Sequence, residues 1–131
     1  MDSFTLDLPI PHKMLHPNSK VFSLRAAYAR SARVKEYRQA VRLLAEVALN
    51  RRDPPRWKEA VAQAVFRYPD PGRRRDRGNL FGWLKAGFDG LQDAGIIEDD
   101  SGLVHQPVRI EKADSPHVVI TITPIGVPCH A

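Results

Sequence analysis

The sequence is poor in the residues and patterns that build several common kinds of site. A single cysteine, Cys129, in 131 residues excludes an internal disulfide bond and a zinc site made of cysteine pairs. No apolar run approaches the roughly 20 residues that a membrane-spanning helix needs, and no glycine-rich phosphate loop is found. The chain opens on a strand-like segment rather than a signal peptide. We therefore expect a cytoplasmic protein in a reducing compartment, with no membrane partner and no small-molecule organic cofactor.

Positive charge, by contrast, is abundant. The chain has 20 lysines and arginines against 15 acidic residues, for a formal net charge of +5. Such an excess favours a polyanionic partner such as nucleic acid, although many basic proteins bind none. With 43% hydrophobic residues, the chain is long enough for one hydrophobic core and short for two. We predict a single domain over residues 1–131.

The hydrophobic pattern of the first half predicts a strand, a loop and a long helix. Residues 4–8 alternate apolar and polar side chains, which is typical of a half-buried strand. Residues 9–20 hold three prolines and indicate an extended loop. Apolar side chains then recur every three or four residues from about Ser31 to Leu49, which predicts an amphipathic helix ended by Pro54 and Pro55. Its predicted buried stripe consists of Val34, Tyr37, Val41, Leu44 and Ala48.

The second half predicts a strand at 57–68, although its alanines also suit a helix, and a second helix at 79–94. Asn79 would cap this helix and Gly95 would end it. Strand-like runs at 103–112 and 117–123 are expected to form a hairpin around residues 113–116. The order β-α-β-α-β-β predicts an α+β fold with two layers, in which two amphipathic helices pack on a mixed sheet.

A loop dense in arginine precedes the second helix. Residues 70–79 read DPGRRRDRGN, so that Asp76 stands among Arg73, Arg74, Arg75 and Arg77. Guanidinium groups pair bidentately with phosphate, and amides at a helix start point toward it. Two interpretations stay open: a phosphate-binding loop, and a solvated loop whose arginines keep the protein soluble.

Acidic residues and a lysine flank the same helix. Asp99 and Asp100 follow it and by themselves favour a turn. If tertiary packing brings Asp100 to Asp76, the carboxylates among arginines would suit Mg²⁺, which takes oxygen ligands and substrate phosphate. Lys85 and Asp89 stand one helical turn apart, which favours a surface ion pair. The alternative is that Lys85 stabilises charge on a reacting phosphate.

The segment Arg73–Asp100, RRRDRGNLFGWLKAGFDGLQDAGIIEDD, resembles the signature of the RusA-like Holliday-junction resolvases, which are often encoded by prophages. That signature runs D-x-D-N, then L-K-x-x-x-D-x-L-x-x-A-G, then D-D. Weaker agreement covers most of the chain, including a first strand that ends in L-P-x-P and a final T-I-T strand. The resemblance implies a homodimeric endodeoxyribonuclease of DNA recombination and repair. It would bind four-way junctions and cut two opposed strands by hydrolysis that depends on Mg²⁺, or on Mn²⁺.

Each motif position implies a role for a residue of this chain. Asp76 matches the first acid of D-x-D-N, Asp100 the essential acid of D-D, and Lys85 the lysine of the second helix. The resemblance therefore makes Asp76, Lys85 and Asp100 catalytic. Asp76 and Asp100, with Asp99 beside them, would bind the metal. The phosphate contacts would come from the arginines of the loop, which are Arg73, Arg74, Arg75 and Arg77.

One position departs from the signature. Gly78 stands where the motif has its second acid, and glycine has no side-chain ligand to offer. Either Asp99 or Glu98 would have to replace that carboxylate, or the chain binds junctions without cutting them. The sequence thus leaves two functions: a junction endonuclease, and a DNA-junction-binding protein on the same fold. A basic protein whose partner is another protein has little support, because the only apolar stripes are those needed for the core.

Overall fold

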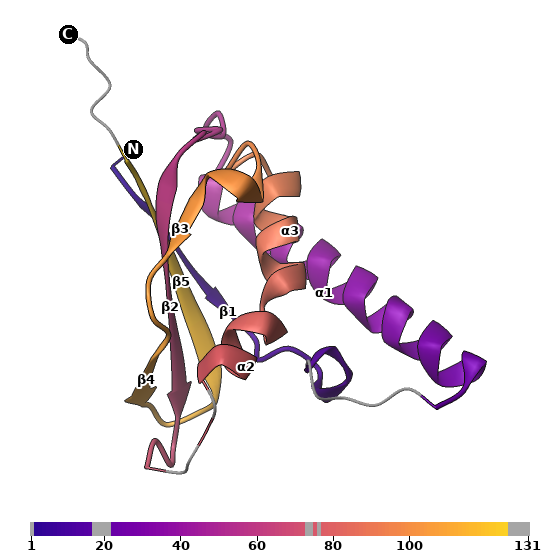
Figure 1. Cartoon of the computed structure of the whole chain (residues 1–131). Helices are drawn as coiled ribbons and strands as arrows, with labels where there is room; N and C mark the ends of the chain where they lie inside the picture. Colours follow the sequence, from indigo (N-terminus) through magenta and orange to yellow (C-terminus); the bar gives the residue numbers. More distant parts are fainter. Residues whose placement is uncertain (1, 17–21, 73–74, 76, 126–131) are drawn as a thin grey trace, which may run out of the picture.

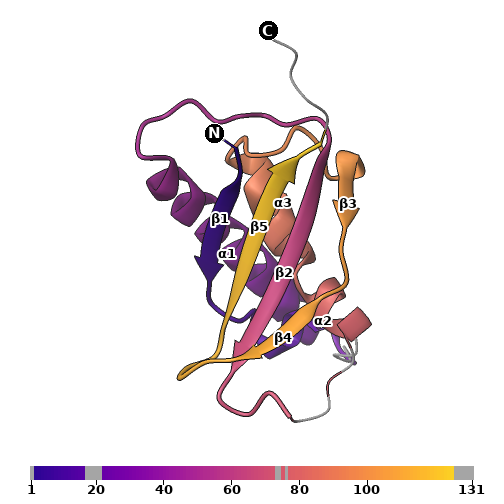
Figure 2. The ribbon, with the colours of Figure 1, turned by 90° about the vertical axis from the view of Figure 1, so that its left-hand side faces the viewer.

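A five-stranded mixed sheet carries the helices on one of its faces (Figure 1). The computed structural model describes residues 2–16, 22–72, 75 and 77–125, apart from the side chains of 77–79. Seen edge on, the sheet forms one layer and the helices the other (Figure 1). The view onto the opposite face of the sheet shows no helix in front of it in the described part of the chain (Figure 2). The predicted two-layer α+β fold is confirmed.

The sheet runs in the order β1-β5-β2-β3, with β4 also paired to β2. The strands are β1 (Phe4–Leu8), β2 (Ala60–Tyr68), β3 (Leu103–His105), β4 (Arg109–Lys112) and β5 (His117–Pro124). Strand β5 is antiparallel to both of its neighbours, β1 and β2. Strands β3 and β4 pair in parallel with β2, one near its start and one near its end. Together they form one interrupted edge of the sheet.

The predicted hairpin around residues 113–116 is wrong. Strand β2 lies between β4 and β5, so the chain passes the end of β2 to reach the other side (Figure 2). Strand β2 is central because every second side chain faces the helices and is buried, while eight of its residues are in register with β5. A hairpin pattern read from two neighbouring runs cannot detect a third strand between them. The inward residues of β2 are Ala60, Ala62, Ala64, Phe66 and Tyr68.

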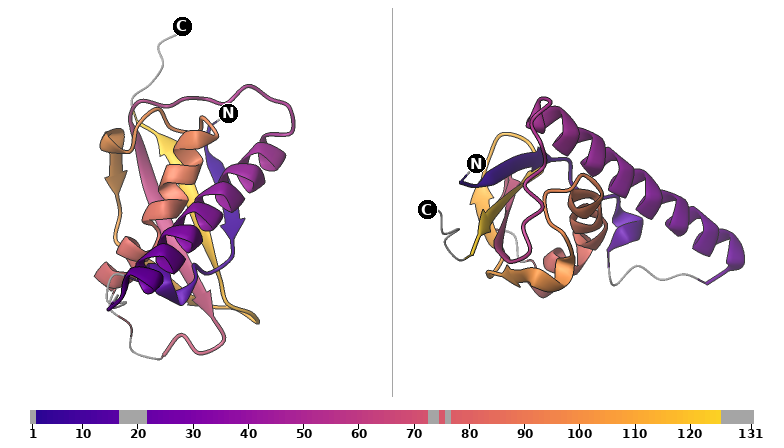
Figure 3. Two further views of the ribbon diagram at one scale, coloured as in Figure 1. Left: turned by 90° about the vertical axis from the view of Figure 1, so that its right-hand side faces the viewer. Right: turned by 90° about the horizontal axis from the view of Figure 1, so that it is seen from above.

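The first helix, α1, spans Leu24–Leu49 and starts earlier than its apolar stripe predicts. The Ser23 hydroxyl accepts a hydrogen bond from the Ala26 amide at 3.1 Å and so caps the helix N-terminus. The first turns are rich in alanine, which has a high intrinsic helix propensity. The early turns project beyond the sheet (Figures 1 and 3), so no buried stripe marks them. Leu44 is 39% exposed, contrary to prediction. The buried residues are Tyr37, Val41, Ala45 and Leu49.

The predicted second helix is two helices, α2 (Arg77–Trp83) and α3 (Lys85–Asp93). Between them the Leu84 amide donates to the Phe81 carbonyl, three residues back, at 3.0 Å. This tighter turn breaks the regular four-residue ladder. Asn79 lies inside α2, so its predicted role as N-cap is wrong. Gly95 has a φ of 83°, a conformation that glycine adopts without strain, and it follows the helix end as predicted.

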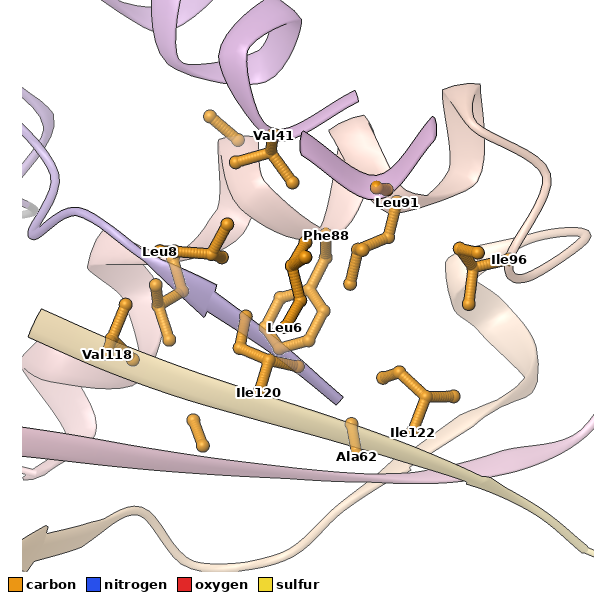
Figure 4. Packing of buried hydrophobic residues seen from close by; sticks show 14 of the residues in the cluster. Leu6, Leu8, Val41, Ala62, Phe88, Leu91, Ile96, Val118, Ile120 and Ile122 are labelled. Carbon is orange, nitrogen blue, oxygen red and sulfur yellow. The ribbon is translucent and has the colours of Figure 1, made fainter. Parts of the chain in front are cut away.

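The core forms where α1, α3 and the sheet meet (Figure 4). Val41 of α1, Phe88 and Leu91 of α3, and Ile120 of β5 are all buried and point into this space. A Cβ atom at Gly90 would lie 2.5 Å from the Arg38 carbonyl oxygen, so only glycine lets the two helices approach this closely. No helix in the described residues is long and apolar enough to span a membrane.

The loop after β1 is tied to both helical segments. The Tyr37 hydroxyl donates to the Pro9 carbonyl at 2.7 Å, and the Trp83 indole donates to the His12 carbonyl at 2.9 Å. Burial raises the pKa of the Tyr37 hydroxyl. The loop was predicted to be extended, and it includes a short 3₁₀ helix, η1 (Lys13–Leu15). Two partly buried hydrogen bonds thus hold this loop beside α1 and the end of α2.

Candidate functional site

Lys85 brings two carboxylates together at the start of α3. Its Nζ lies 3.4 Å from Oδ2 of Asp100 and 3.7 Å from Oδ1 of Asp89. The predicted ion pair with Asp89 is confirmed, and the contact with Asp100 links residues 15 positions apart. The lysine side chain is 71% exposed, so its charge faces solvent. We call these three residues the Lys85 centre.

Asp100 reaches Lys85 because its turn is fixed against the segment before β2. The Glu98 amide donates to the Trp57 carbonyl at 2.9 Å, and the short 3₁₀ helix η2 (Asp100–Gly102) follows. A Cβ atom at Gly102 would collide with the Lys58 carbonyl oxygen, so glycine permits this close approach. The predicted turn at Asp99 and Asp100 therefore does more than reverse the chain, since it places Asp100 beside α3.

Asp99 has a local structural role in the same turn. Its carboxylate accepts hydrogen bonds from the Ser101 amide at 3.4 Å and from the Ser101 hydroxyl at 3.1 Å. These bonds favour the charged form and lower the pKa of the Asp99 carboxyl. The carboxylate thus caps η2, as acids commonly do at the start of a helix. A metal-binding role for Asp99 stays a prediction.

The arginine loop is described only in part. Arg73, Arg74 and Asp76 lie outside the described residues, and of Arg77 only the backbone, which starts α2, is described. The Arg75 guanidinium lies 3.6 Å from the centroid of the Tyr68 ring and 3.2 Å from Asp70 Oδ1. Its side chain is only 14% exposed. Arg75 therefore has partners within the protein, and its predicted phosphate contact stays a prediction.

Two hollows flank Lys85, and we name each after one residue that lines it. The His105 pocket has a volume of about 190 Å³, and the Arg30 groove has a volume of about 400 Å³. Lys85 and Gly82 line both. The other residues of the His105 pocket are Phe81, Phe88, Asp100 and His105. The other residues of the Arg30 groove are Leu15, Arg30, Val34, Trp83, Ala86 and Asp89.

His105 and Arg30 were both missed by the sequence analysis. The His105 ring centroid is 4.5 Å from that of Phe81 and 4.9 Å from that of Phe88, edge to face in each case. Desolvation against these rings lowers the pKa of His105, although the charge of Asp100 acts in the opposite direction. A signal for His105 was available in the sequence. The predicted strand begins shortly after Asp99 and Asp100, so some of its side chains are expected to lie near these acids. Arg30 was missed because the helix was expected to start at Ser31.

The described residues fit a magnesium ion only in part. Within the described ranges no three histidine, cysteine or acidic side chains cluster closely enough to hold a metal. Asp100 and Asp89 are two carboxylates, but the ammonium of Lys85 lies between them. Magnesium commonly takes one or two carboxylates, several waters and substrate phosphate. Asp100 therefore suits such an ion as one ligand, and a second would have to come from Asp76, which lies outside the described residues.

A scan against models of protein families finds no match for this chain, and a search among curated proteins finds none either. The resemblance to RusA-like resolvases consequently rests on the residues of the segment 73–100. The geometry adds one independent observation, which is that two of the residues singled out by the resemblance, Lys85 and Asp100, are in contact.

Proposed function

We propose that this protein binds four-way DNA junctions and hydrolyses phosphodiester bonds at the Lys85 centre. The observation that carries the proposal is the contact between Lys85 and Asp100, which are far apart in sequence and are the lysine and acid of the resolvase-like motif. An ion pair between neighbours on one helix, such as Lys85 and Asp89, follows from helical spacing alone. The contact between Lys85 and Asp100 instead depends on the path of the chain from α3 to η2. Net positive charge supports a polyanionic partner.

Lys85 has the properties of a phosphate-binding and charge-stabilising group. Its ammonium is exposed, and Asp89 and Asp100 hold it at the rim shared by both hollows. Arg30 lines the same groove and adds a second cation for the DNA backbone. As a nucleophile adds to the phosphorus atom, negative charge grows on the phosphate oxygens, and a cation already oriented there stabilises it.

Asp100, with Asp76, would hold Mg²⁺ or Mn²⁺. When bound, the metal would lower the pKa of a water molecule and polarise the phosphodiester. Asp100 is 41% exposed at its side chain, so substrate can approach it directly. We further propose a homodimer, because paired cuts in two opposed strands need two such centres on one junction.

A second function, junction binding without cleavage, is favoured by one feature of the sequence and one of the structure. Gly78 removes a motif acid, and the described residues include no third carboxylate in contact with Lys85. A lost metal ligand reduces turnover far more than it reduces binding to the phosphate backbone. The two functions therefore differ in chemistry but not in the DNA they select.

Incubation with an end-labelled four-way junction and Mg²⁺ or Mn²⁺ separates the two functions. The nuclease proposal predicts symmetric nicks in opposed strands, lost in Asp100→Asn and kept in the control Asp114→Asn, which changes an exposed acid in the turn before β5. Tight junction binding without nicks supports the second function. In that case Gly78→Asp tests the missing ligand, because a large gain in cleavage would identify it.

Metal binding can be measured without activity. A ligand that binds only the folded state stabilises it and so raises Tm. At 100 times its Kd the free energy of unfolding increases by about 2.7 kcal/mol. We expect Mg²⁺ to raise Tm of the wild type and to have less effect on Asp100→Asn, with Asp114→Asn again as the control. An equal rise in all three proteins would show that the ion does not bind at Asp100.

A further inference from the structure

The His105 pocket combines an aromatic wall with charged groups at its rim, and nothing in the proposed hydrolysis uses the aromatic side. Phe81, Phe88 and His105 form the wall, while Lys85 and Asp100 stand at the rim. We propose that this pocket receives one unstacked nucleobase of the bound DNA, next to the phosphate held at Lys85. This inference rests on the proposed function and names a further binding site within it.

The aromatic wall has the chemistry that binds bases. Every nucleobase has a π face, and stacking on an aromatic side chain is favourable whatever the base. Phe81 is 37% exposed, so part of its ring is open to a ligand. The two edge-to-face contacts of His105 leave the rings at steep angles of 77° and 75° rather than stacked on one another. The exposed part of the Phe81 ring is the surface that a planar ligand can reach, since Phe88 is only 5% exposed.

Electrostatics supports an uncharged wall. Burial lowers the pKa of His105 and so favours its uncharged imidazole, while the charge of Asp100 acts in the opposite direction. The titratable groups that face it in the pocket are Asp100 and Lys85. A neutral ring stacks on a base without repelling the ammonium of Lys85, which is left to bind phosphate.

The size of the pocket limits the ligand to a single ring system. Its volume of about 190 Å³ is below the roughly 300–1,000 Å³ of pockets that enclose drug-sized ligands. A paired and stacked base in a duplex cannot enter such a hollow, whereas a base next to a branch point can lose a stacking neighbour when the arms of the junction separate. Extrusion of that base costs the least, which would direct the protein to branched DNA.

The pocket can be tested without unfolding the protein, because only one of its three rings belongs to the core. Phe88 is 5% exposed and packs with the buried residues, whereas Phe81 and His105 lie outside the buried set. Phe81→Ala and His105→Ala are the test variants. Phe22→Ala is the matched control, because Phe22 is 87% exposed, precedes α1 and does not line the pocket.

The experiment compares two four-way junctions, one with all its bases and one with an abasic residue at each branch-point nucleotide. We expect Phe81→Ala to weaken binding to the complete junction by about 5-fold to 150-fold, the range for loss of one stacked base. On the abasic junction the same variant should differ from the wild type by less than 2-fold. His105→Ala should follow the same pattern, and Phe22→Ala should match the wild type on both junctions. A 2-aminopurine at the branch point should change its fluorescence on binding to wild type but not to Phe81→Ala.

Other outcomes overturn the inference or the proposed function separately. Equal losses on complete and abasic junctions, or no loss on either, would overturn the base pocket and leave junction binding intact. Wild-type protein that binds single-stranded DNA through Phe81 but does not prefer junctions would contradict the proposed function and support the pocket. Failure to bind DNA of any kind would overturn both.

Discussion

The two ends of α3 differ in almost every physical respect. Near its C-terminal end Leu91 is fully buried and Gly90 lies against the backbone of α1, so side chains there fix the fold. At its N-terminal end Lys85 is 71% exposed and its partners are carboxylates from α3 and η2. One short helix thus joins a tightly packed region to an exposed charged cluster. Substitutions at its two ends should therefore separate stability from DNA binding.

The largest expected effect on stability is at the buried end. Leu91→Ala removes a side chain with no solvent exposure and leaves a cavity, which typically costs about 2–5 kcal/mol. Leu43→Ala is the matched control, because Leu43 is 51% exposed on α1 and should cost less than about 0.5 kcal/mol. Urea unfolding followed by circular dichroism measures both. Equal losses would mean that the core does not lie where α3 meets the sheet.

Gly90→Ala tests the close approach of α1 and α3. In an open helix, alanine in place of glycine usually stabilises by about 1 kcal/mol. Here the added Cβ would lie 2.5 Å from the Arg38 carbonyl oxygen and 2.9 Å from Cβ of Val41. Because backbone must move, we expect a net loss of about 1–3 kcal/mol. Gly72→Ala, where no atom lies within 4 Å of the new Cβ, serves as the control in the same unfolding assay. A stabilised Gly90→Ala would show that the helices lie further apart.

A smaller and pH-dependent effect is expected where Arg38 of α1 holds Asp93 of α3 by two hydrogen bonds of 2.6 and 2.8 Å. The hydrogen bonds from Arg38 lower the pKa of the Asp93 carboxyl below its ordinary value of 3.8. The stabilisation is therefore present above pH 3.8 and is lost as pH falls through the lowered pKa. Because both side chains are partly exposed, we expect Asp93→Asn to cost about 0.5–1 kcal/mol at pH 7. Unfolding at pH 7 and pH 3 should show this difference shrink, and a constant difference would count against the ion pair.

The smallest expected effect on stability is at the open end. Lys85→Met removes two exposed ion pairs, each worth about 0.5 kcal/mol or less, so Tm should barely change. The affinity for DNA should nevertheless fall, and the slope of log affinity against log salt should become shallower by about 1, as expected for one lost phosphate contact. A filter-binding titration over several salt concentrations measures this. An unchanged slope would mean that Lys85 does not contact phosphate.

Much of the fold follows from periodicity, because alternation and three-to-four spacing report directly which side chains are buried. Strand β2 and the buried half of α1 were predicted for that reason. The first turns of α1 were missed since they project from the core and have no apolar stripe. The misplaced hairpin has a different origin. Strand pairing is decided by tertiary packing, and the sequence around residues 113–116 does not report that β2 separates β4 from β5.

For the candidate site, the sequence predicted the members better than their surroundings. The pair Lys85 and Asp89 followed from helical spacing, whereas the contact of Lys85 with Asp100 could be expected only from the resemblance. The break at Leu84, which makes Lys85 the first residue of α3, left no sequence signal because the apolar pattern runs through it. His105 was unremarkable until β3 placed it beside Phe81 and Phe88.

Competition between a labelled four-way junction and unlabelled duplex of the same sequence tests the central claim most directly. We predict that wild-type protein prefers the junction by at least about 10-fold, a difference of roughly 1.4 kcal/mol. Lys85→Met should lose junction affinity, whereas Lys112→Met, which removes an exposed cation at the end of β4, should lose much less. Equal binding of junction and duplex, or an equal response to the two lysine substitutions, would contradict the assignment of this surface to branched DNA.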